Sequence, residues 1–379
     1  MAQRVRTDPV LFFTIIALVI FGLVAVYSAS SVRGSELQND PFYHLVRQAR
    51  VAAIGIPLLM ILKRRDYRTM NNPTWAFIAV GITIVLLIVA YFDDSRYHRW
   101  LTILGITFQP SELAKPALAL FLAWFLTMRA KAISTKSTVM PAAAVIGAFA
   151  GLVVLGDFGT ALVLVAGAAV AFLVAGLEKR YIAIASAVAL VFLVVAIFTK
   201  PYRRARVVMT LDPQFKVVNW IDPSGELAQS IKQSAVVADP KYQPEQSLIA
   251  LGSGGLAGRD LMKSRQKLFY LPVAHTDFIL AIIGEELGVL GTAAVLCAFV
   301  AIGWRGLRLA ATVPDSFGRY LALVITTMFV FQALLNITVV LAMVPTKGIP
   351  LPLISYGGSS LLCTLISLGM LLSVSDHAG

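Results

Sequence analysis

The sequence of 379 residues is poor in charge, in cysteine and in histidine. Charged residues make up 14% of it, against about a quarter in an average soluble protein, so a soluble globular fold is excluded. The two cysteines, Cys297 and Cys363, both fall in apolar runs, which argues against a structural disulfide. Among the four histidines, only His275 lies close in sequence to another candidate catalytic residue, Asp277. These two side chains are too few ligands to argue a metal site. The chain shows no nucleophile elbow, internal repeat or low-complexity tract.

Hydrophobic residues are abundant instead, at 58% of the chain, with a mean hydropathy of +0.80. Runs of roughly 17–25 apolar residues are long enough to cross a bilayer as helices. We therefore expect an all-α polytopic membrane protein with a single transmembrane domain over residues 1–379. The first run is too long for the core of a signal peptide, so we expect it to be retained. The ten predicted spans are 10–28, 46–62, 74–92, 111–128, 139–156, 159–177, 181–199, 277–304, 319–343 and 357–375.

The net charge of +12 is explained by the loops rather than by nucleic-acid binding. Basic residues gather in alternate short loops, as the positive-inside rule requires of loops facing the cytoplasm. This alternation predicts a multi-pass protein with both termini in the cytoplasm. Residues 200–276, between spans 7 and 8, then form a large extracytoplasmic loop, and a loop of that length is usually functional or disordered.

The stretch Ser264–Gly288 is the strongest candidate for a site. It begins with basic and aromatic residues, including Arg265 and Lys267, and Asp277 directly precedes an apolar run. Asp277 is therefore expected where water meets lipid, at the outward face, where a carboxylate can take a proton from a lipid-borne substrate. The structural alternative, an N-cap of the eighth span, is compatible with catalysis.

Polar residues inside spans are costly in lipid and are functional candidates by default. Glu112 and Lys115 share a helix face, either as a structural ion pair or as a charged wall of a substrate cavity, and Ser111 suits the N-cap before them. Asp157 is expected to cap the sixth span. Gln332 and Asn336, four residues apart, are expected to bond to neighbouring helices.

Three features of the outward loops are left with open alternatives. Basic residues after the seventh span, including Arg203, could meet lipid headgroups or a pyrophosphate. A glycine-rich turn over 252–258 could aim backbone N–H groups at phosphate, although a flexible turn is the stronger interpretation. The three prolines in 345–352 forbid a helix, so we expect a re-entrant loop beside Asp277 with Lys347 in reach of an anion.

A carboxylate base surrounded by cations suits transfer from a lipid pyrophosphate. The base takes a hydroxyl proton, and the cations stabilise the departing diphosphate. We expect burial by the outer loop to raise the pKa of Asp277 towards neutrality, because a carboxyl with an ordinary pKa is a weak base at pH 7.

Several motifs resemble the SEDS family (shape, elongation, division, sporulation) of bacterial cell-wall proteins: QPSELAK, DFGTAL, GSGGL, SRQKLFYLP, AHTDFI, GEELG and ISYGGSS. The match runs from the first span to the last and leans towards the division member of the family. The resemblance implies a SEDS-type ten-span peptidoglycan glycosyltransferase that polymerises lipid II at the septum of the cytoplasmic membrane. It implies Asp277 as the essential aspartate and matches Glu112 and Lys115 to conserved residues. Its implied partners are a class B penicillin-binding protein and other divisome proteins.

The candidate substrate-binding residues are Glu112, Lys115, Arg203, Arg265, Lys267, Lys347 and His275, of which the arginines and lysines other than Lys115 rest on placement alone. No cofactor is firmly expected, and a divalent cation (Mg²⁺ or Mn²⁺) is left open. The family usually has Glu where Val273 stands here, two residues before His275. The alternatives are a lipid II flippase and a non-catalytic scaffold for the transpeptidase.

Overall fold

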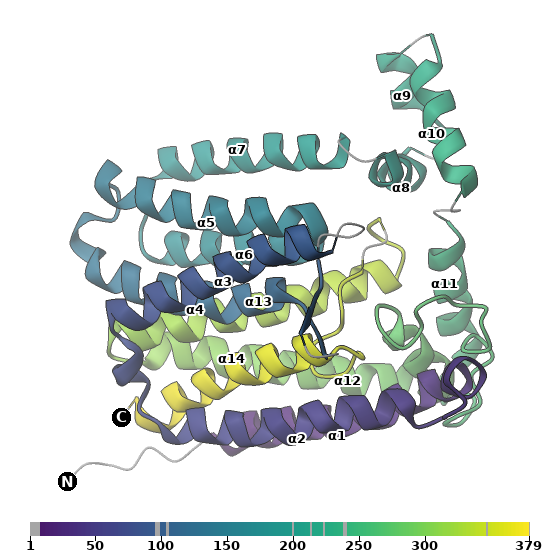
Figure 1. Ribbon diagram of the computed structural model, residues 1–379, viewed down its shortest axis with the longest axis horizontal. Helices are drawn as coiled ribbons and strands as arrows, with labels where there is room; N and C mark the ends of the chain where they lie inside the picture. Colours follow the sequence, from purple (N-terminus) through teal and green to yellow (C-terminus); the bar gives the residue numbers. More distant parts are fainter. Residues whose placement is uncertain are drawn as a thin grey trace.

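Long apolar helices run side by side through the molecule, and their connections gather at its two ends (Figure 1). The computed structural model describes residues 8–94, 99–103, 106–198, 201–212, 214–222, 224–237, 241–345 and 348–378. The first long helix begins and the last one ends at the same end of the bundle, where the backbone N–H of Asp8 donates to Ser375 Oγ at 3.3 Å. We call the opposite end, which carries the segment 255–278, the distal end.

Eight of the described helices are long and apolar enough to cross a bilayer, which confirms a polytopic helical membrane protein. A ninth apolar helix, α6 (Phe158–Val174), has 17 residues, and α7 (Lys179–Phe198) has 20. Short 3₁₀ turns, η1 (Tyr67–Met70) and η2 (Ala130–Ala132), follow α2 and α4. The eight helices are α1 (Pro9–Gln38), α2 (Tyr43–Arg64), α3 (Pro73–Asp93), α4 (Pro110–Met128), α5 (Lys136–Gly156), α12 (Ile279–Thr312), α13 (Ser316–Val340) and α14 (Gly358–His377).

The centre of the bundle is α4, which packs against α3, α6, α13 and α14. Leu118, Leu122 and Leu126 follow one another at helical spacing and are all fully buried. Large apolar residues such as Phe13, Phe92 and Val300 are exposed on the outer helices. That inversion is expected where the surrounding solvent is hydrocarbon.

Two expectations about local structure were wrong. The distal end contains a small antiparallel hairpin, β1 (Leu101–Ile103) and β2 (Ile106–Phe108), so the protein is not entirely α-helical. The run LTILGITF is too short for a helix and is rich in β-branched residues, which favour strands. The N-cap of α4 is Gln109 rather than Ser111, because Pro110 occupies the first helical position, where its fixed φ suits a helix start.

The described part of the segment between α7 and α12 contains four helices and is not one open loop. It contains α8 (Pro201–Leu211), α9 (Lys216–Ile221), α10 (Glu226–Val237) and α11 (Tyr242–Gly254). Helices α8 to α10 enclose a small apolar cluster of their own, and α9 and α10 project away from the bundle, whereas α11 packs against α12 (Figure 1).

The proline-rich segment before α14 is irregular and enters the bundle. Its residues Ile349, Leu351 and Ile354 are buried. A Cβ on Gly22, in the middle of α1, would lie 2.5 Å from the carbonyl oxygen of Leu353, so the segment reaches the depth of the α1 midpoint. Gln332 and Asn336 of α13 donate hydrogen bonds to carbonyl oxygens of this segment. These bonds satisfy backbone groups that have no partner within a helix.

Candidate active site

The segment that carries Asp277 joins α11 to α12 through a series of turns. Four of its non-glycine residues have positive φ: Asp260 (75°), Met262 (69°), Phe269 (65°) and Val273 (51°). Such residues cost about 1–3 kcal/mol each and persist only where the surroundings hold them in place. Of the four residue types, Val273 is the least compatible with a positive φ, because its side chain is β-branched.

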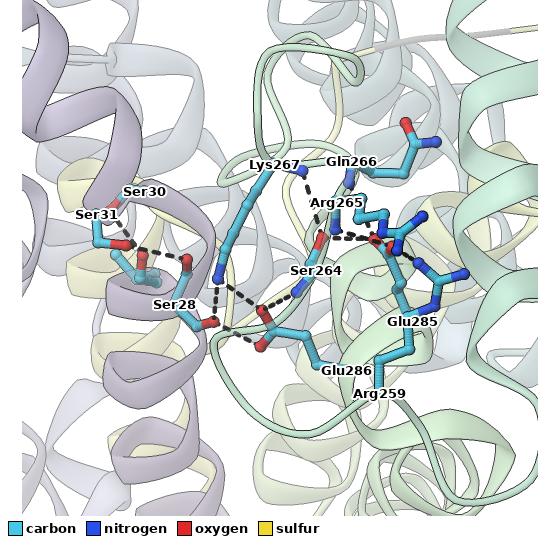
Figure 2. A network of polar contacts seen from close by, with 11 residues as sticks. Ser28, Ser30, Ser31, Arg259, Ser264, Arg265, Gln266, Lys267, Glu285 and Glu286 are labelled. Carbon is cyan, nitrogen blue, oxygen red and sulfur yellow. Dashed lines mark hydrogen bonds and ion pairs between the residues drawn. The ribbon is translucent and has the colours of Figure 1, made fainter.

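Two buried carboxylates of α12, Glu285 and Glu286, hold this segment in place (Figure 2). Glu285 accepts hydrogen bonds from the backbone N–H groups of Arg265 and Gln266, at 3.0 and 3.2 Å, and from the hydroxyl of Ser264. Glu286 pairs with Lys267 at 2.9 Å, and both side chains are at most 4% exposed. We call these residues, together with Ser28 and Arg259, the anchor network.

The anchor network also joins the segment to α1. Ser28 of α1 donates its hydroxyl hydrogen to Glu286 Oε2 at 2.5 Å, and Lys267 Nζ lies 3.5 Å from the same hydroxyl. Arg259 lies 3.5 Å from Glu285 on the other side. Each charge of the network therefore has a charged or strongly polar partner, which is the condition for keeping ionised groups away from water.

Directly after these carboxylates, α12 is broken at Gly288, which has a φ of 65°. The glycine-rich turn after α11 fills the break: the N–H of Val289 donates to Gly255 O at 3.0 Å. A Cβ on Gly258 would lie 2.1 Å from the carbonyl oxygen of Glu286, and one on Gly288 would lie 2.4 Å from Gly258 N. Gly258 and Gly288 thus serve a close backbone approach, a role that neither alternative for the glycine-rich turn had named.

Asp277 lies between the re-entrant segment and α13. Its carbonyl oxygen accepts from Asn336 Nδ2 at 2.7 Å, and the same amide nitrogen donates to Ile349 O at 2.7 Å. A Cβ on Gly348 would lie 2.9 Å from Asp277 Oδ2, so the carboxylate lies directly against the backbone of the re-entrant loop. This confirms the expectation that the re-entrant loop lies beside Asp277.

The carboxylate of Asp277 does not cap α12, because the cap residue is Phe278 and no side chain bonds there. Within the described ranges it has no hydrogen bond or ion pair, and it retains partial contact with solvent. Burial, together with the nearby charge of Asp157, raises the pKa of Asp277 to about 7, although the cations Arg99 and Arg206 oppose this shift. A carboxyl with that pKa is half ionised at neutral pH and can both accept and release a proton.

Asp157 is the second carboxylate of this region, and its role is structural. Its oxygens accept from the backbone N–H and the hydroxyl of Thr160, which confirms the predicted cap of α6. Arg99 pairs with it at 3.0 Å, and Gln109 donates to it at 2.9 Å. Burial opposes its ionisation, but the charge of Arg99 and these hydrogen bonds outweigh burial and hold the pKa of Asp157 below its usual range.

Glu112 and Lys115 of α4 form the predicted ion pair, at 2.7 Å, and both are buried. Lys115 also donates to Gln332 Oε1 at 2.6 Å, and Gln332 donates in turn to Pro350 O at 2.9 Å. The pair is therefore one side chain away from the re-entrant loop. The cavity beside Lys115 measures about 20 Å³, which is room for one water molecule and far too small for a sugar.

The other predicted binding residues lie in different surroundings. Arg203 of α8 donates to Val154 O at 3.1 Å, at the distal end of α5. The side chain of Arg265 is exposed, whereas that of Lys267 is turned inward to Glu286. Lys347 lies outside the described residues. Sequence proximity to Asp277 therefore does not place Lys267 beside the Asp277 carboxylate.

His275 packs among aromatic rings instead of facing the Asp277 carboxylate. Its ring centroid lies 4.7 Å from that of His44 and 5.6 Å from that of Tyr356. Burial, with the nearby His44 and Arg33, lowers the pKa of His275 to about 3, so the imidazole is neutral at physiological pH.

Arg99 and Arg206, which act on Asp277, were missed as individual candidates. Arg206 belongs to the basic run after the seventh predicted span, and Arg99 lies in a short loop predicted to face outward. A base in an outward loop departs from the positive-inside pattern, and that departure is the signal that could have found Arg99. Across the described ranges, no three or more His, Cys, Asp or Glu residues come together in a group that could hold a metal ion.

The chain matches the model of the cell cycle protein family that comprises FtsW, RodA and SpoVE, over residues 9–379. It belongs to this family. A relative from Geobacter sp. (strain M18), the "Probable peptidoglycan glycosyltransferase FtsW", is 38% identical over 377 residues, which are 98% of this chain and 97% of the relative. The FtsW/RodA/SpoVE family thus accounts for almost the whole chain, as the motifs had suggested.

Two solved structures share the fold. One, described as "Structural coordination of polymerization and crosslinking by a peptidoglycan synthase complex", has a TM-score of 0.72 and 28% identity, with 97% of each chain covered. The rod shape determining protein RodA of Thermus thermophilus has a TM-score of 0.66 and 26% identity, with 96% of this chain and 95% of RodA covered. Fold and family therefore agree.

Proposed function

We propose that this chain is a peptidoglycan glycosyltransferase that polymerises lipid II during septal wall synthesis. The observation that carries the proposal is the state of Asp277: a partly exposed carboxylate, beside an irregular re-entrant segment, with a pKa raised to about 7. Membership of a family whose relatives are named peptidoglycan glycosyltransferases supplies the substrate class. The protein works with a class B penicillin-binding protein, as the kinship with a synthase complex suggests.

The proposal includes ten membrane spans, with α6 and α7 added to the eight long apolar helices. The chain forms one domain, and the helical segment 200–276 lies on the extracytoplasmic side. Basic residues such as Lys63, Arg64 and Arg129 flank the end of the bundle where α1 begins, and the positive-inside rule therefore supports a cytoplasmic location for both termini. The distal end, with Asp277, then faces outward from the bacterial cytoplasmic membrane.

In the proposed reaction, the Asp277 carboxylate removes the proton of the acceptor GlcNAc hydroxyl as that oxygen attacks the anomeric carbon of the donor MurNAc. The new C–O glycosidic bond forms while the bond to the diphosphate breaks, and undecaprenyl diphosphate leaves with the bonding electron pair. Arg99 and Arg206 lie near enough to act on the charge of Asp277, so they also stabilise charge that develops on the leaving group. If Mg²⁺ or Mn²⁺ took part, Asp277 would be the carboxylate able to hold it, and the ion would offset negative charge on the diphosphate.

The test compares Asp277→Asn with Asp260→Asn in the purified complex with the transpeptidase, using lipid II polymerisation as the readout. Asp260 lies in the same segment, is 76% exposed on its side chain and pairs with Lys263, so its variant controls for the loss of a charge in that loop. Loss of a general base lowers the rate by about 10²–10⁴-fold. We expect that loss for Asp277→Asn only, and polymerisation at the wild-type rate would remove the assignment.

A flippase or a scaffold would differ in the same assays. Transport predicts that lipid II crosses a vesicle membrane without a polymer product, and a scaffold predicts that Asp277 is dispensable. The buried charges that first suggested transport, Glu285, Glu286 and Glu112, are bound to partners inside the protein. None of these observations favours transport over polymerisation.

A further inference from the structure

A second cluster of cationic and aromatic side chains lies at the distal end, on the His275 side of the segment that carries Asp277. Arg33 comes from the last part of α1, His44 and Arg47 from the first turns of α2, and Tyr356 from the end of the re-entrant segment. The His44 ring contacts Tyr356, at 4.8 Å between centroids, and also contacts His275. Three segments far apart in the sequence therefore meet at one place.

The cluster is built rigidly. Buried Gln48 of α2 donates to Ser355 O at 3.1 Å and accepts from the N–H of Gly357 at 3.2 Å, so it clamps the backbone on both sides of Tyr356. The N–H of Tyr356 donates to His275 O at 3.0 Å, and the Ser355 hydroxyl donates to Thr276 O at 2.6 Å. The backbone of the Asp277 segment and the aromatic ring of the cluster are thereby fixed to each other.

The charge of the cluster is not neutralised. Arg33 and Arg47 both act electrostatically on His44, and no carboxylate contributes at that ring. Neither arginine forms an ion pair with an acidic residue in the part of the chain that the structure describes. The Arg47 guanidinium also interacts with the hydroxyl of Tyr356. Within the same described part, His44 Nδ1 is buried without a hydrogen-bond partner.

We propose that Arg33, Arg47, His44 and Tyr356 form an anion subsite that binds the diphosphate of a lipid-linked saccharide. Two guanidinium groups supply the donors and the two positive charges that a diphosphate diester requires. The Tyr356 hydroxyl adds a donor of fixed position, and the His44 ring holds the Tyr356 ring in place through their contact. The inference rests on the proposed function, because a polymerase of lipid II handles two lipid diphosphates, one on each reacting molecule.

The position of the subsite fits the binding of one of these two lipid diphosphates. Arg99 and Arg206 act on Asp277 itself, so they belong with the bond that breaks at the donor. The new cluster is joined to the same segment through His275 and Thr276 but contains neither of those arginines. It therefore suits the diphosphate that stays intact on the other lipid molecule while the sugar between them reacts.

The test measures binding without turnover, in Asp277→Asn protein in nanodiscs of phosphatidylcholine alone. The probe is a fluorescent undecaprenyl-diphosphate-linked disaccharide, with inorganic pyrophosphate as the competitor. A lost charge-assisted hydrogen bond commonly changes affinity by about tenfold. We expect Arg33→Gln and Arg47→Gln each to raise the Kd about tenfold, and Arg47→Lys to raise it less because the charge stays.

The matched control is Lys263→Gln, which removes an exposed basic side chain from the distal end, where Lys263 is already paired with Asp260. Its Kd should equal that of the parent, and all variants should keep the parent's unfolding temperature. An unchanged Kd in the Arg33→Gln/Arg47→Gln double variant overturns the proposal. It is overturned equally if the variants differ only in bilayers containing phosphatidylglycerol, because the arginines then bind bulk lipid headgroups.

The two hypotheses fail separately. Normal binding in the arginine variants, with polymerisation lost in Asp277→Asn, would remove the subsite and leave the enzyme assignment standing. Weakened binding in the arginine variants, with no polymerisation by the wild-type complex, would support the subsite and remove the enzyme assignment.

Discussion

The anchor network predicts a large stability difference between two lysines that are four residues apart. Lys267 pairs with Glu286 at 2.9 Å with both side chains at most 4% exposed, whereas Lys263 pairs with Asp260 at 2.8 Å with side chains 68% and 76% exposed. Removing one partner of a buried pair costs about 3–5 kcal/mol, because it leaves an uncompensated charge. An exposed pair contributes about 0–1 kcal/mol.

We therefore expect Lys267→Met to lower the free energy of unfolding by several kcal/mol and Lys263→Met to leave it nearly unchanged. Unfolding of the purified protein in detergent can be followed by the fluorescence of its five tryptophans. The double variant Lys267→Met/Glu286→Gln should lose less than the sum of its single variants, because no unpaired charge remains buried. Equal effects of the two lysine variants would refute the reasoning.

Two further predictions concern pH and the break in α12. Polymerisation should fall as pH decreases through about 7, because the folded pKa of Asp277 is about 7 and only its ionised form accepts a proton; a rate that is flat across this pH range would contradict it. The free energy of unfolding should change in the opposite direction: because the pKa of Asp277 is raised in the folded state, the wild type becomes more stable as pH falls from about 7 towards 3.8. Asp277→Asn should lack this gain in unfolding experiments. Gly288→Ala should lower the free energy of unfolding by about 2 kcal/mol or more, because its Cβ would lie 2.4 Å from Gly258 N at a φ of 65°. Gly151→Ala, with open space around it, should stabilise α5 by up to about 1 kcal/mol. Similar unfolding midpoints for the two variants would argue against the close approach of Gly288 to Gly258.

The sequence predicts those features that depend on local rules. Hydrophobic runs reveal most of the helices, and prolines reveal the re-entrant segment, because no helix can contain three of them in eight residues. The Glu112–Lys115 pair follows from helical spacing, and the cap at Asp157 follows from its position at a helix start. Each of these predictions needs only neighbours in the sequence.

The features that sequence reasoning missed depend on the direction of side chains and on distant partners. Lys267 is ten residues before Asp277, but its partners are Glu286, nineteen residues later, and Ser28 on α1. The hairpin β1–β2 was overlooked because a three-residue strand is too short to show a period of two. Nothing in the sequence brings Arg33, His44 and Tyr356 together, because they meet only through tertiary packing.

The pairing of charges divides the polar residues of this protein by role. Glu285, Glu286, Lys267 and Arg259 are matched with one another, and matched buried charges fix a geometry but leave little free energy for a ligand. Asp277 and the arginines of the second cluster have no ion partner in the described ranges and keep contact with solvent, so a substrate can meet them without displacing an acidic or basic protein partner. The strained turns between α11 and α12 show why both kinds are needed. The matched charges hold a segment that would otherwise relax, and the unmatched carboxylate at its end is thereby kept where a hydroxyl can reach it.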